Sequence, residues 1–259
     1  MTGSGPTSED TKLAIGVDIG GSGIKGAPVD IAAGEFAGER VRIPTPQPST
    51  PGAVAEVVAR IVGDMPAGRL GVTFPAVVQH GVARTAANVD DSWIGTDVGA
   101  VLAEATGRQV HVVNDADAAG VAEARYGAAR GVAGVVVVTT LGTGIGSALL
   151  MDGALVPNTE LGHLQVEGYD AETRAADSAR ERENLSWADW AKRLQTYYRV
   201  LEDLLWPDLI VVGGGVSKKH QKFLSLLDLR TPIKPAELRN TAGIVGAAVL
   251  VTEQSSTAG

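Results

Sequence analysis

One carboxylate and three glycine-rich turns are the features of this 259-residue chain whose types and spacing could do chemistry. The carboxylate, Asp115, follows an apolar run over residues 110–113 and precedes an alanine-rich stretch with helical periodicity. The run predicts a buried parallel strand, which would place Asp115 at the crevice where open α/β sheets bind ligands. A carboxylate there can accept a proton from a hydroxyl group. The alternative is that Asp115 only caps the following helix.

The first glycine-rich turn follows a predicted strand over residues 13–17. Its backbone N–H groups carry no Cβ obstruction, so phosphate oxygens can approach them closely. Lys25 could add a point charge, and Asp18 could hold Mg²⁺ through water, since Mg²⁺ dehydrates reluctantly. The alternative is a hairpin turn without a ligand. The phosphate-binding residues expected here are Asp18, Gly20, Gly21, Ser22 and Lys25.

Two further glycine clusters follow predicted strands in the second half of the chain. Residues 141–146 form a second candidate phosphate site, with Thr140, Gly142, Thr143 and Gly144 as its expected binding residues. Gly213, Gly214 and Gly215 suit either the flat face of a purine or a sugar, or a tight strand-to-helix connection. No Walker-type loop occurs in the chain, and the first turn does not open a helix as a Rossmann fingerprint would.

Glu160 and His163 lie three residues apart. On a helix this spacing can bind a metal. Pro157, Asn158 and the internal Gly162 instead predict a loop, and the sequence shows no third ligand. Hydrogen bonding to hydroxyl groups is therefore the better functional interpretation, and a polar loop with a purely structural role is the alternative.

The elements that must position these residues repeat along the chain. Each half opens with an antiparallel meander whose first turn is glycine-rich, and it continues with strand–helix units. Such a repeat predicts an α/β fold of two similar domains facing each other across a cleft. We expect a disordered tail over residues 1–11, a smaller domain over 12–115 plus 241–253, and a larger domain over 116–240.

Expected strands in the first half are 24–31, 35–43 and 70–74, with helices over 52–64 and 97–105 and a hairpin within 77–89. In the second half we expect strands over 135–140, 147–151 and 154–156, with a two-residue hairpin turn at Asp152 and Gly153. We also expect a helix over 186–205, capped by Ser186, and a last helix over 241–252. Residues 167–184 are polar, without strand character, and a helix should begin near Ser217.

Composition excludes several classes of protein. A formal net charge of −8 gives no general attraction to nucleic acid or to anionic membranes. The amino-terminal residues show no signal peptide, and no apolar run reaches the roughly 20 residues that span a bilayer. The chain has no cysteine, which excludes disulfides and thiolate zinc sites. We expect a cytoplasmic protein without zinc.

Taken together, the motifs resemble one family. DIGGSGIKG (18–26), NDADAAG (114–120), LGTGIG (141–146), ELGH (160–163) and VVGGG (211–215) occur in the order seen in the ROK sugar kinases of the hexokinase–actin superfamily. The resemblance covers nearly all of the chain after residue 12. Within the family, the chain is similar to bacterial polyphosphate/ATP-glucokinases, because residues 18–30 read DIGGSGIKGAPVD and the cysteine-rich zinc motif that often follows the ELGH-type segment is absent.

The resemblance implies two actin-like (ribonuclease H-like) domains and phosphoryl transfer from ATP or polyphosphate to O6 of glucose, with Mg²⁺ and a homodimeric protein. It implies that Asp115 is the general base and that Gly213, Gly214, Gly215 and Lys218 contact the nucleotide. The sugar-binding residues it implies are Asn88, Asn114, Asp115, Glu160 and His163, with Glu183 as the candidate for a second glutamate.

Two alternatives remain open at this point. A ROK kinase for another hexose, such as mannose, carries the same motifs. A sugar-responsive ROK regulator would carry a DNA-binding helix-turn-helix ahead of the first turn, where we expect only a short tail.

Polyphosphate use requires a local basic surface, because the net charge of −8 repels a polyanion. The candidates are Lys218, Lys219, His220 and Lys222, joined by Lys192 and Arg193. The alternative is that these are ordinary solvated charges.

Overall fold

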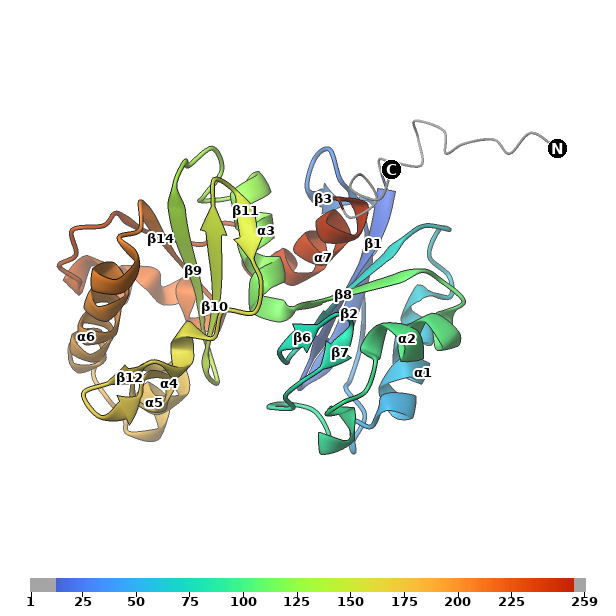
Figure 1. The fold of residues 1–259 in the computed structure, drawn as a ribbon, viewed down its shortest axis with the longest axis horizontal. Coiled ribbons are helices and arrows are strands. Elements are labelled where there is room, and N and C mark those ends of the chain that lie inside the picture. Colours follow the sequence, from blue (N-terminus) through green and yellow to red (C-terminus); the bar gives the residue numbers. More distant parts are fainter. Residues whose placement is uncertain (1–12, 254–259) are drawn as a thin grey trace. The chain divides into compact units, whose positions relative to one another are not determined.

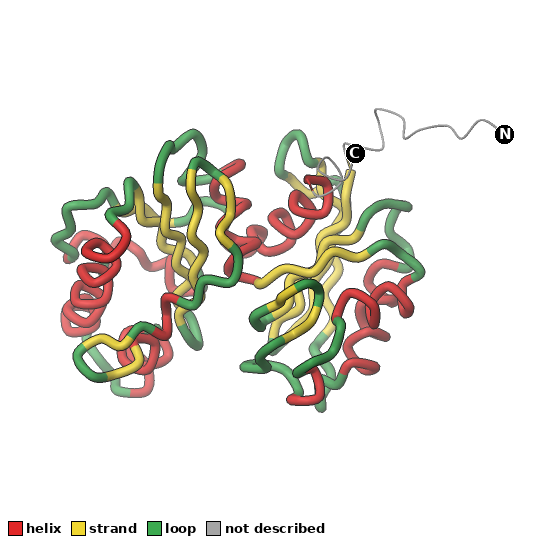
Figure 2. The backbone as a smooth tube through the Cα atoms, viewed as in Figure 1, coloured by secondary structure: helices red, strands yellow, loops and turns green. Residues whose placement is uncertain are grey.

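A computed structural model describes residues 13–253, whose contacts divide into two units. One unit runs to Ala118 and is completed by the segment that begins at Thr241, and the other runs from Ala119 to Asn240. Each unit consists of a sheet with helices packed against it (Figures 1 and 2). Among the described residues, none of the helices combines the length and the apolar character needed to cross a membrane.

The sheet of the first unit has the order β3-β2-β1-β5-β8, and β4 also pairs with β2. β1 and β2 form the antiparallel hairpin of the meander, whereas β1, β5 and β8 are parallel, so the carboxyl ends of these three meet at one edge. The single strand expected over 35–43 is wrong, because two short strands pair separately with β2. The strands are β1 (Leu13–Gly20), β2 (Gly23–Asp30), β3 (Glu35–Phe36), β4 (Val41–Ile43), β5 (Leu70–Phe74) and β8 (Val110–Asn114).

Helices cover this sheet on both faces. Helix α1 (Pro51–Val62) contacts β2 and β4 and packs against α2 (Val98–Thr106), whereas α7 (Ala242–Glu253) contacts β1, β5 and β8. The close approach of α7 requires glycine, since a Cβ at Gly16 or Gly71 would collide with the backbone of α7. Helix α7 therefore completes the core of the first unit.

Two local features complete the first unit. The expected hairpin within 77–89 is confirmed: β6 (Val78–Gln79) and β7 (Val82–Ala83) pair across His80 and Gly81, which both have positive φ. Helix α3 (Asp115–Tyr126) begins directly after β8. A 3₁₀-helix over Asp91–Trp93 buries Trp93 against Phe74, with ring centroids 4.7 Å apart, and so anchors the loop that carries Asn88.

The sheet of the second unit has the order β11-β10-β9-β14-β15. It repeats the pattern of the first, because an antiparallel hairpin with a glycine-rich turn is followed by parallel strands. The turn predicted at Asp152 and Gly153 is confirmed. The strands are β9 (Val135–Leu141), β10 (Ile145–Met151), β11 (Ala154–Val156), β14 (Leu209–Gly213) and β15 (Ile233–Pro235).

The long helix α6 (Trp187–Leu205) is capped by Ser186 as expected. It buries Trp190, Leu194 and Tyr198 in one hydrophobic core with strand residues of this sheet. The segment before it forms helices α4 (Ala171–Ala175) and α5 (Asp177–Arg182). A small hairpin of β12 (Gln165–Val166) and β13 (Tyr169–Asp170) precedes α4, so the expectation of no strand is wrong at Tyr169 and Asp170. The helix expected from Ser217 is a 3₁₀-helix over Gly215–Lys222, followed by another over Leu224–Leu226.

Candidate active site

In the first unit, Asn88 lies beside the first glycine-rich turn. The turn is the tip of the β1–β2 hairpin, where Gly20 pairs with Gly23. A Cβ at Gly21 would meet Asn88 at 3.6 Å, so the structure brings together two residues predicted separately to bind phosphate and sugar. Thr45 donates its hydroxyl to the carbonyl of Gly20 and so helps to hold the turn.

A row of polar residues crosses the sheet next to this turn, because Thr73, Asp18, Lys25 and Arg42 are register partners on β5, β1, β2 and β4. Lys25 Nζ lies 3.0 Å from Asp18 Oδ2, and the hydroxyl of Thr73 donates to Asp18 Oδ1 at 2.9 Å. The ammonium group expected for phosphate is thus paired with Asp18.

Arg42, which sequence reasoning missed, supplies a second cation at this turn. Its guanidinium donates to the carbonyl of Ser22 at 3.2 Å and lies against Gly23. Only the register of β4 with β2 places Arg42 there, and nothing local in the sequence indicates that register.

Asn114 and Asp115 lie where β8 meets α3, and Asn114 is the residue that caps the helix. Asn114 Oδ1 accepts from the N–H groups of Ala116 at 2.8 Å and Asp117 at 3.2 Å, and its amide donates to the carbonyl of Ala76 at 3.0 Å. Asp115 accepts from Ala116 N–H at 2.9 Å, and the residue is exposed. The buried Asn114 supplies most of the cap, and Asp115 is exposed at the start of α3.

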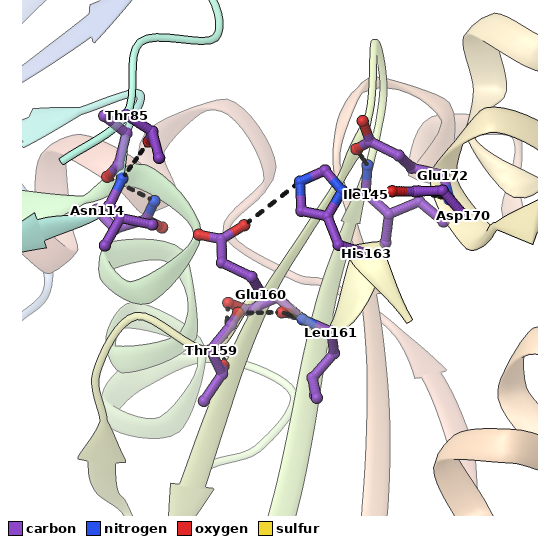
Figure 3. Close-up of polar contacts among 12 residues, drawn as sticks. Thr85, Asn114, Ile145, Thr159, Glu160, Leu161, His163, Asp170 and Glu172 are labelled. Atoms are coloured by element: carbon purple, nitrogen blue, oxygen red, sulfur yellow. Dashed lines mark hydrogen bonds and ion pairs between the residues drawn. The ribbon is translucent and has the colours of Figure 1, made fainter. Parts of the chain in front are cut away.

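In the second unit, Glu160 precedes and His163 ends a 3₁₀-helix over Leu161–His163, where we expected a loop (Figure 3). Ser147 on β10 anchors this turn, because its hydroxyl donates to the carbonyl of Thr159 and accepts from Leu161 N–H. Both side chains are exposed, and His163 Nε2 lies 3.9 Å from Glu160 Oε2. The turn therefore presents a carboxylate and an imidazole side by side.

Asp170 and Glu172, neither of which the sequence indicated, complete this cluster. His163 Nδ1 lies 2.8 Å from Asp170 Oδ2, and Glu172 Oε2 accepts from Ile145 N–H at 3.1 Å (Figure 3). The hydrogen bond to Asp170 and the charges of Glu172, Asp170 and Glu160 raise the pKa of His163, while partial burial opposes this shift.

Ligand-type atoms of His163, Asp170 and Glu172 lie within 4.8 Å of one another. Each of these side chains already has a protein partner, and we identify none of them as a metal ligand.

In the second glycine-rich turn, which was expected to bind phosphate, two backbone N–H groups already have partners within the protein. Gly142 N–H donates to the carbonyl of Gly144 at 3.0 Å, and Ile145 N–H is used by Glu172. Ser178 at the start of α5 holds the turn through the carbonyls of Gly142 and Thr143. Thr143 remains exposed at the tip.

The third glycine cluster lies beside the second, because Gly213 pairs with Thr140 and Gly214 packs against the backbone of Leu141. Gly214 has a φ of +80°, a conformation that favours glycine. Next to it is a cavity of about 250 Å³ lined by Ser217, His220, Lys234, Pro235, Ala236, Glu237 and Arg239.

Glu183, the expected second sugar-binding glutamate, is engaged in ion pairs. Its carboxylate lies 2.6 Å from Arg193 and 3.2 Å from Arg182, and the hydrogen bond from Arg193 is the main cause of its lowered pKa. Besides Glu160, the glutamate that lies near His163 is Glu172, whose N–H donates to Asp170, the hydrogen-bond partner of His163.

Two of the lysines expected to bind polyphosphate lie near the indole of Trp187. Lys219 Nζ and Lys222 Nζ lie 5.8 Å and 5.5 Å from the ring centroid of Trp187, and the Arg180 guanidinium lies 4.3 Å from it. The two further candidates are paired with acids, Lys192 with Asp189 at 2.8 Å and Arg193 with Glu183. We name Arg180, Lys219 and Lys222 the Trp187 cluster.

The family model described as "ROK family" matches residues 14–177. The chain belongs to the ROK family. Among ROK relatives, a protein named polyphosphate glucokinase from Mycobacterium tuberculosis (strain CDC 1551 / Oshkosh) is 51% identical over 96% of this chain and 97% of its own length. The resemblance inferred from the motifs is thereby confirmed.

Solved structures agree with this membership. The inorganic polyphosphate/ATP-glucomannokinase of Arthrobacter sp. strain KM is 56% identical, with a TM-score of 0.89 over 93% of this chain and 99% of that one. A ROK family glucokinase from Streptomyces griseus has a TM-score of 0.78 at 24% identity, over 92% of this chain and 98% of that one, and shows the shared fold. The expected α/β fold of the hexokinase–actin type is confirmed.

Proposed function

We propose that this protein is a glucokinase that transfers a phosphoryl group from inorganic polyphosphate or ATP to O6 of glucose. The observation that carries the proposal is the 51% identity, over nearly the full length of both chains, to a protein named polyphosphate glucokinase. The products are glucose 6-phosphate and a donor shortened by one phosphoryl group.

We assign the proton transfer to Asp115. Its carboxylate accepts the proton of the C6 hydroxyl while O6 bonds to phosphorus and the bond from phosphorus to the donor's bridging oxygen breaks. Its exposure at the start of α3 supports this role.

We assign the remaining sugar hydroxyls to five residues. Asn88, Glu160, His163 and Glu172 offer acceptors and donors suited to hydroxyl groups. Asn114 keeps a place in this set, although most of its hydrogen-bonding capacity serves the cap of α3. Glu172 replaces Glu183 as our candidate for the second glutamate, because Glu183 is held by two arginines.

The donor phosphates are assigned to the two glycine-rich turns, with Arg42 beside the first turn and Thr143 at the tip of the second. Guanidinium groups bind phosphate oxygens in a bidentate manner, which suits Arg42 better than the paired Lys25. Gly213, Gly214, Gly215 and Lys218 are assigned to the nucleotide when ATP is the donor, and the neighbouring cavity supports this.

Asp18 fits a water-mediated Mg²⁺, since each of its carboxylate oxygens has one hydrogen-bond partner and a further lone pair. Bound there, the ion would supply charge neutralisation to the donor phosphates.

The proposal is tested by following glucose 6-phosphate formation with polyphosphate, with ATP and with neither. We expect product with both donors and none without a donor. Product with ATP alone would remove polyphosphate from the proposal, and no product with either would overturn it.

Mannose is a second candidate acceptor, because the relative at 56% identity is named a glucomannokinase. Mannose differs from glucose only in the configuration at C2. Replacing glucose by mannose in the same assay tests this candidate, and an absence of mannose 6-phosphate would exclude it.

A further inference from the structure

Asp170 holds the ring of His163 in one orientation. Its Oδ2 lies 2.8 Å from His163 Nδ1, and its Oδ1 accepts from Glu172 N–H at 3.2 Å as the cap of helix α4. Because the carboxylate is fixed by a helix terminus, it is a rigid partner for the imidazole. An ionised carboxylate only accepts hydrogen bonds, so Nδ1 must carry a proton.

This hydrogen bond also determines the direction in which the other ring nitrogen, Nε2, points. With Nδ1 protonated and held by Asp170, Nε2 faces the carboxylate of Glu160, 3.9 Å away (Figure 3). Imidazole Nε2 and carboxylate Oε2 are then two exposed polar groups, side by side, that can hydrogen-bond hydroxyl groups. The charged groups around the ring in this unit are Glu160, Asp170 and Glu172, all acidic.

We propose that Asp170 is a positioning residue for sugar recognition, which acts through His163 by fixing its ring orientation and its Nδ1–H form. The proposal rests on the proposed function, because it presumes that His163 and Glu160 bind glucose hydroxyls. Asp170 itself touches His163 and the start of α4 and needs no contact with the sugar. Where a histidine binds a metal, loss of the group that holds its other ring nitrogen lowers metal affinity or activity about ten- to a hundredfold.

The test is a double-mutant cycle of Asp170→Asn and His163→Gln. Asparagine has one side-chain oxygen, so it cannot both cap α4 and accept from His163, yet it preserves the size of the side chain and a good helix cap. Asp97→Asn is the matched control, because Asp97 caps α2 in the same way by accepting from Ala100 N–H and lies in the other unit.

Glucose affinity is measured by calorimetry without a donor, and the KM for glucose and kcat are measured separately. Asp170→Asn should raise the dissociation constant and the KM for glucose about tenfold with little change in kcat. In the His163→Gln background the same change should alter affinity by less than about twofold, because the group through which it acts is gone. The Asp97→Asn control should leave all three quantities unchanged.

Nitrogen-15 NMR of the imidazole in the unliganded wild-type protein should show a proton on Nδ1. Equal losses in both backgrounds, an unchanged glucose affinity or an unprotonated Nδ1 would overturn the proposal. A wild-type protein that neither binds nor phosphorylates glucose would overturn the proposed function instead. Glucose affinity that falls after chelation and returns with added Zn²⁺ would also overturn the proposal, because a metal would then hold the ring.

Discussion

At the scale of single residues, Asp115 offers the most direct test of the chemistry. Asp115→Asn preserves the shape of the side chain and leaves the cap supplied by Asn114 in place, so the fold and glucose binding should persist. Turnover should fall by about 10²–10⁴, the usual contribution of a general base. The measurements are kcat and the calorimetric affinity for glucose, and near-normal turnover would show that Asp115 is not the base.

His163 predicts a dependence on pH. Its pKa is raised chiefly by the hydrogen bond to Asp170, so folding favours the protonated ring. The stabilisation that His163 confers is therefore complete below its unfolded pKa of about 6.5 and is lost as pH rises through the higher folded pKa. We expect the difference in urea midpoint between wild type and His163→Gln to shrink across that interval.

NMR titration should place the folded pKa of His163 above 6.5 and show it lowered in Asp170→Asn. A difference in midpoint that stays constant with pH, together with an unshifted pKa, would contradict this.

Site residues that belong to short sequence motifs could be predicted. Site residues that come together only through strand pairing could not. The glycine turns, Asp115, Glu160 and His163 are recognisable from short motifs. Asp170 and Glu172 reach His163 only because a hairpin of two-residue strands reverses the chain, and such strands are too short to show periodicity. Glu183 is the glutamate that the family resemblance suggests, and its two arginine partners become visible only in the fold.

At the scale of elements, the Trp187 cluster joins three segments of the second unit. Arg180 lies on α5, Trp187 begins α6, and Lys219 and Lys222 lie on the 3₁₀-helix after the third glycine cluster. Helix α5 also holds the second glycine-rich turn through Ser178. The same short helix thus links a candidate phosphate site to a group of cations.

This arrangement supports a prediction about the donor. Replacing Lys219 and Lys222 together by glutamine should raise the KM for polyphosphate much more than the KM for ATP, because a long polyanion extends beyond the pocket. The KM for polyphosphate in the wild type should also rise with salt, since exposed charges are screened within about 10 Å at 0.1 M.

Lys192→Gln serves as the matched control for the lysine replacements, because Lys192 is already paired with Asp189 and should not affect either donor. Equal losses with both donors would assign the lysines to the fold or to a shared phosphate site. Unchanged kinetics would place the polyphosphate elsewhere.

Element boundaries were predictable where local chemistry sets them. Ser186 caps α6 and Asp152-Gly153 turns the β10–β11 hairpin, both as the residue types indicate. The split of residues 35–43 into β3 and β4 was not predictable, because both short strands depend on register with β2. The 3₁₀-helix over Gly215–Lys222 likewise lacks the apolar stripe by which an α-helix is recognised.

At the scale of the whole molecule, the chain should need Mg²⁺ and no zinc. The chain has no cysteine and four histidines, which leaves only oxygen and imidazole ligands for a metal. We expect activity to be lost with EDTA and restored by Mg²⁺, and elemental analysis of the purified protein to show no stoichiometric zinc. Zinc at one equivalent, or restoration by Zn²⁺ alone, would contradict this.

The packing of α7 has a consequence for biosynthesis. The second unit is one uninterrupted stretch of the chain. The sheet of the first unit is covered by α7, which follows the last strand of that sheet by more than a hundred residues. A ribosome adds about 5–20 residues per second, so the strands that leave it first remain uncovered for several seconds, until the last helix emerges. The unit that is translated first is therefore the last to be completed. A premature stop after the second unit would leave Gly16 and Gly71 on a bare sheet face open to aggregation.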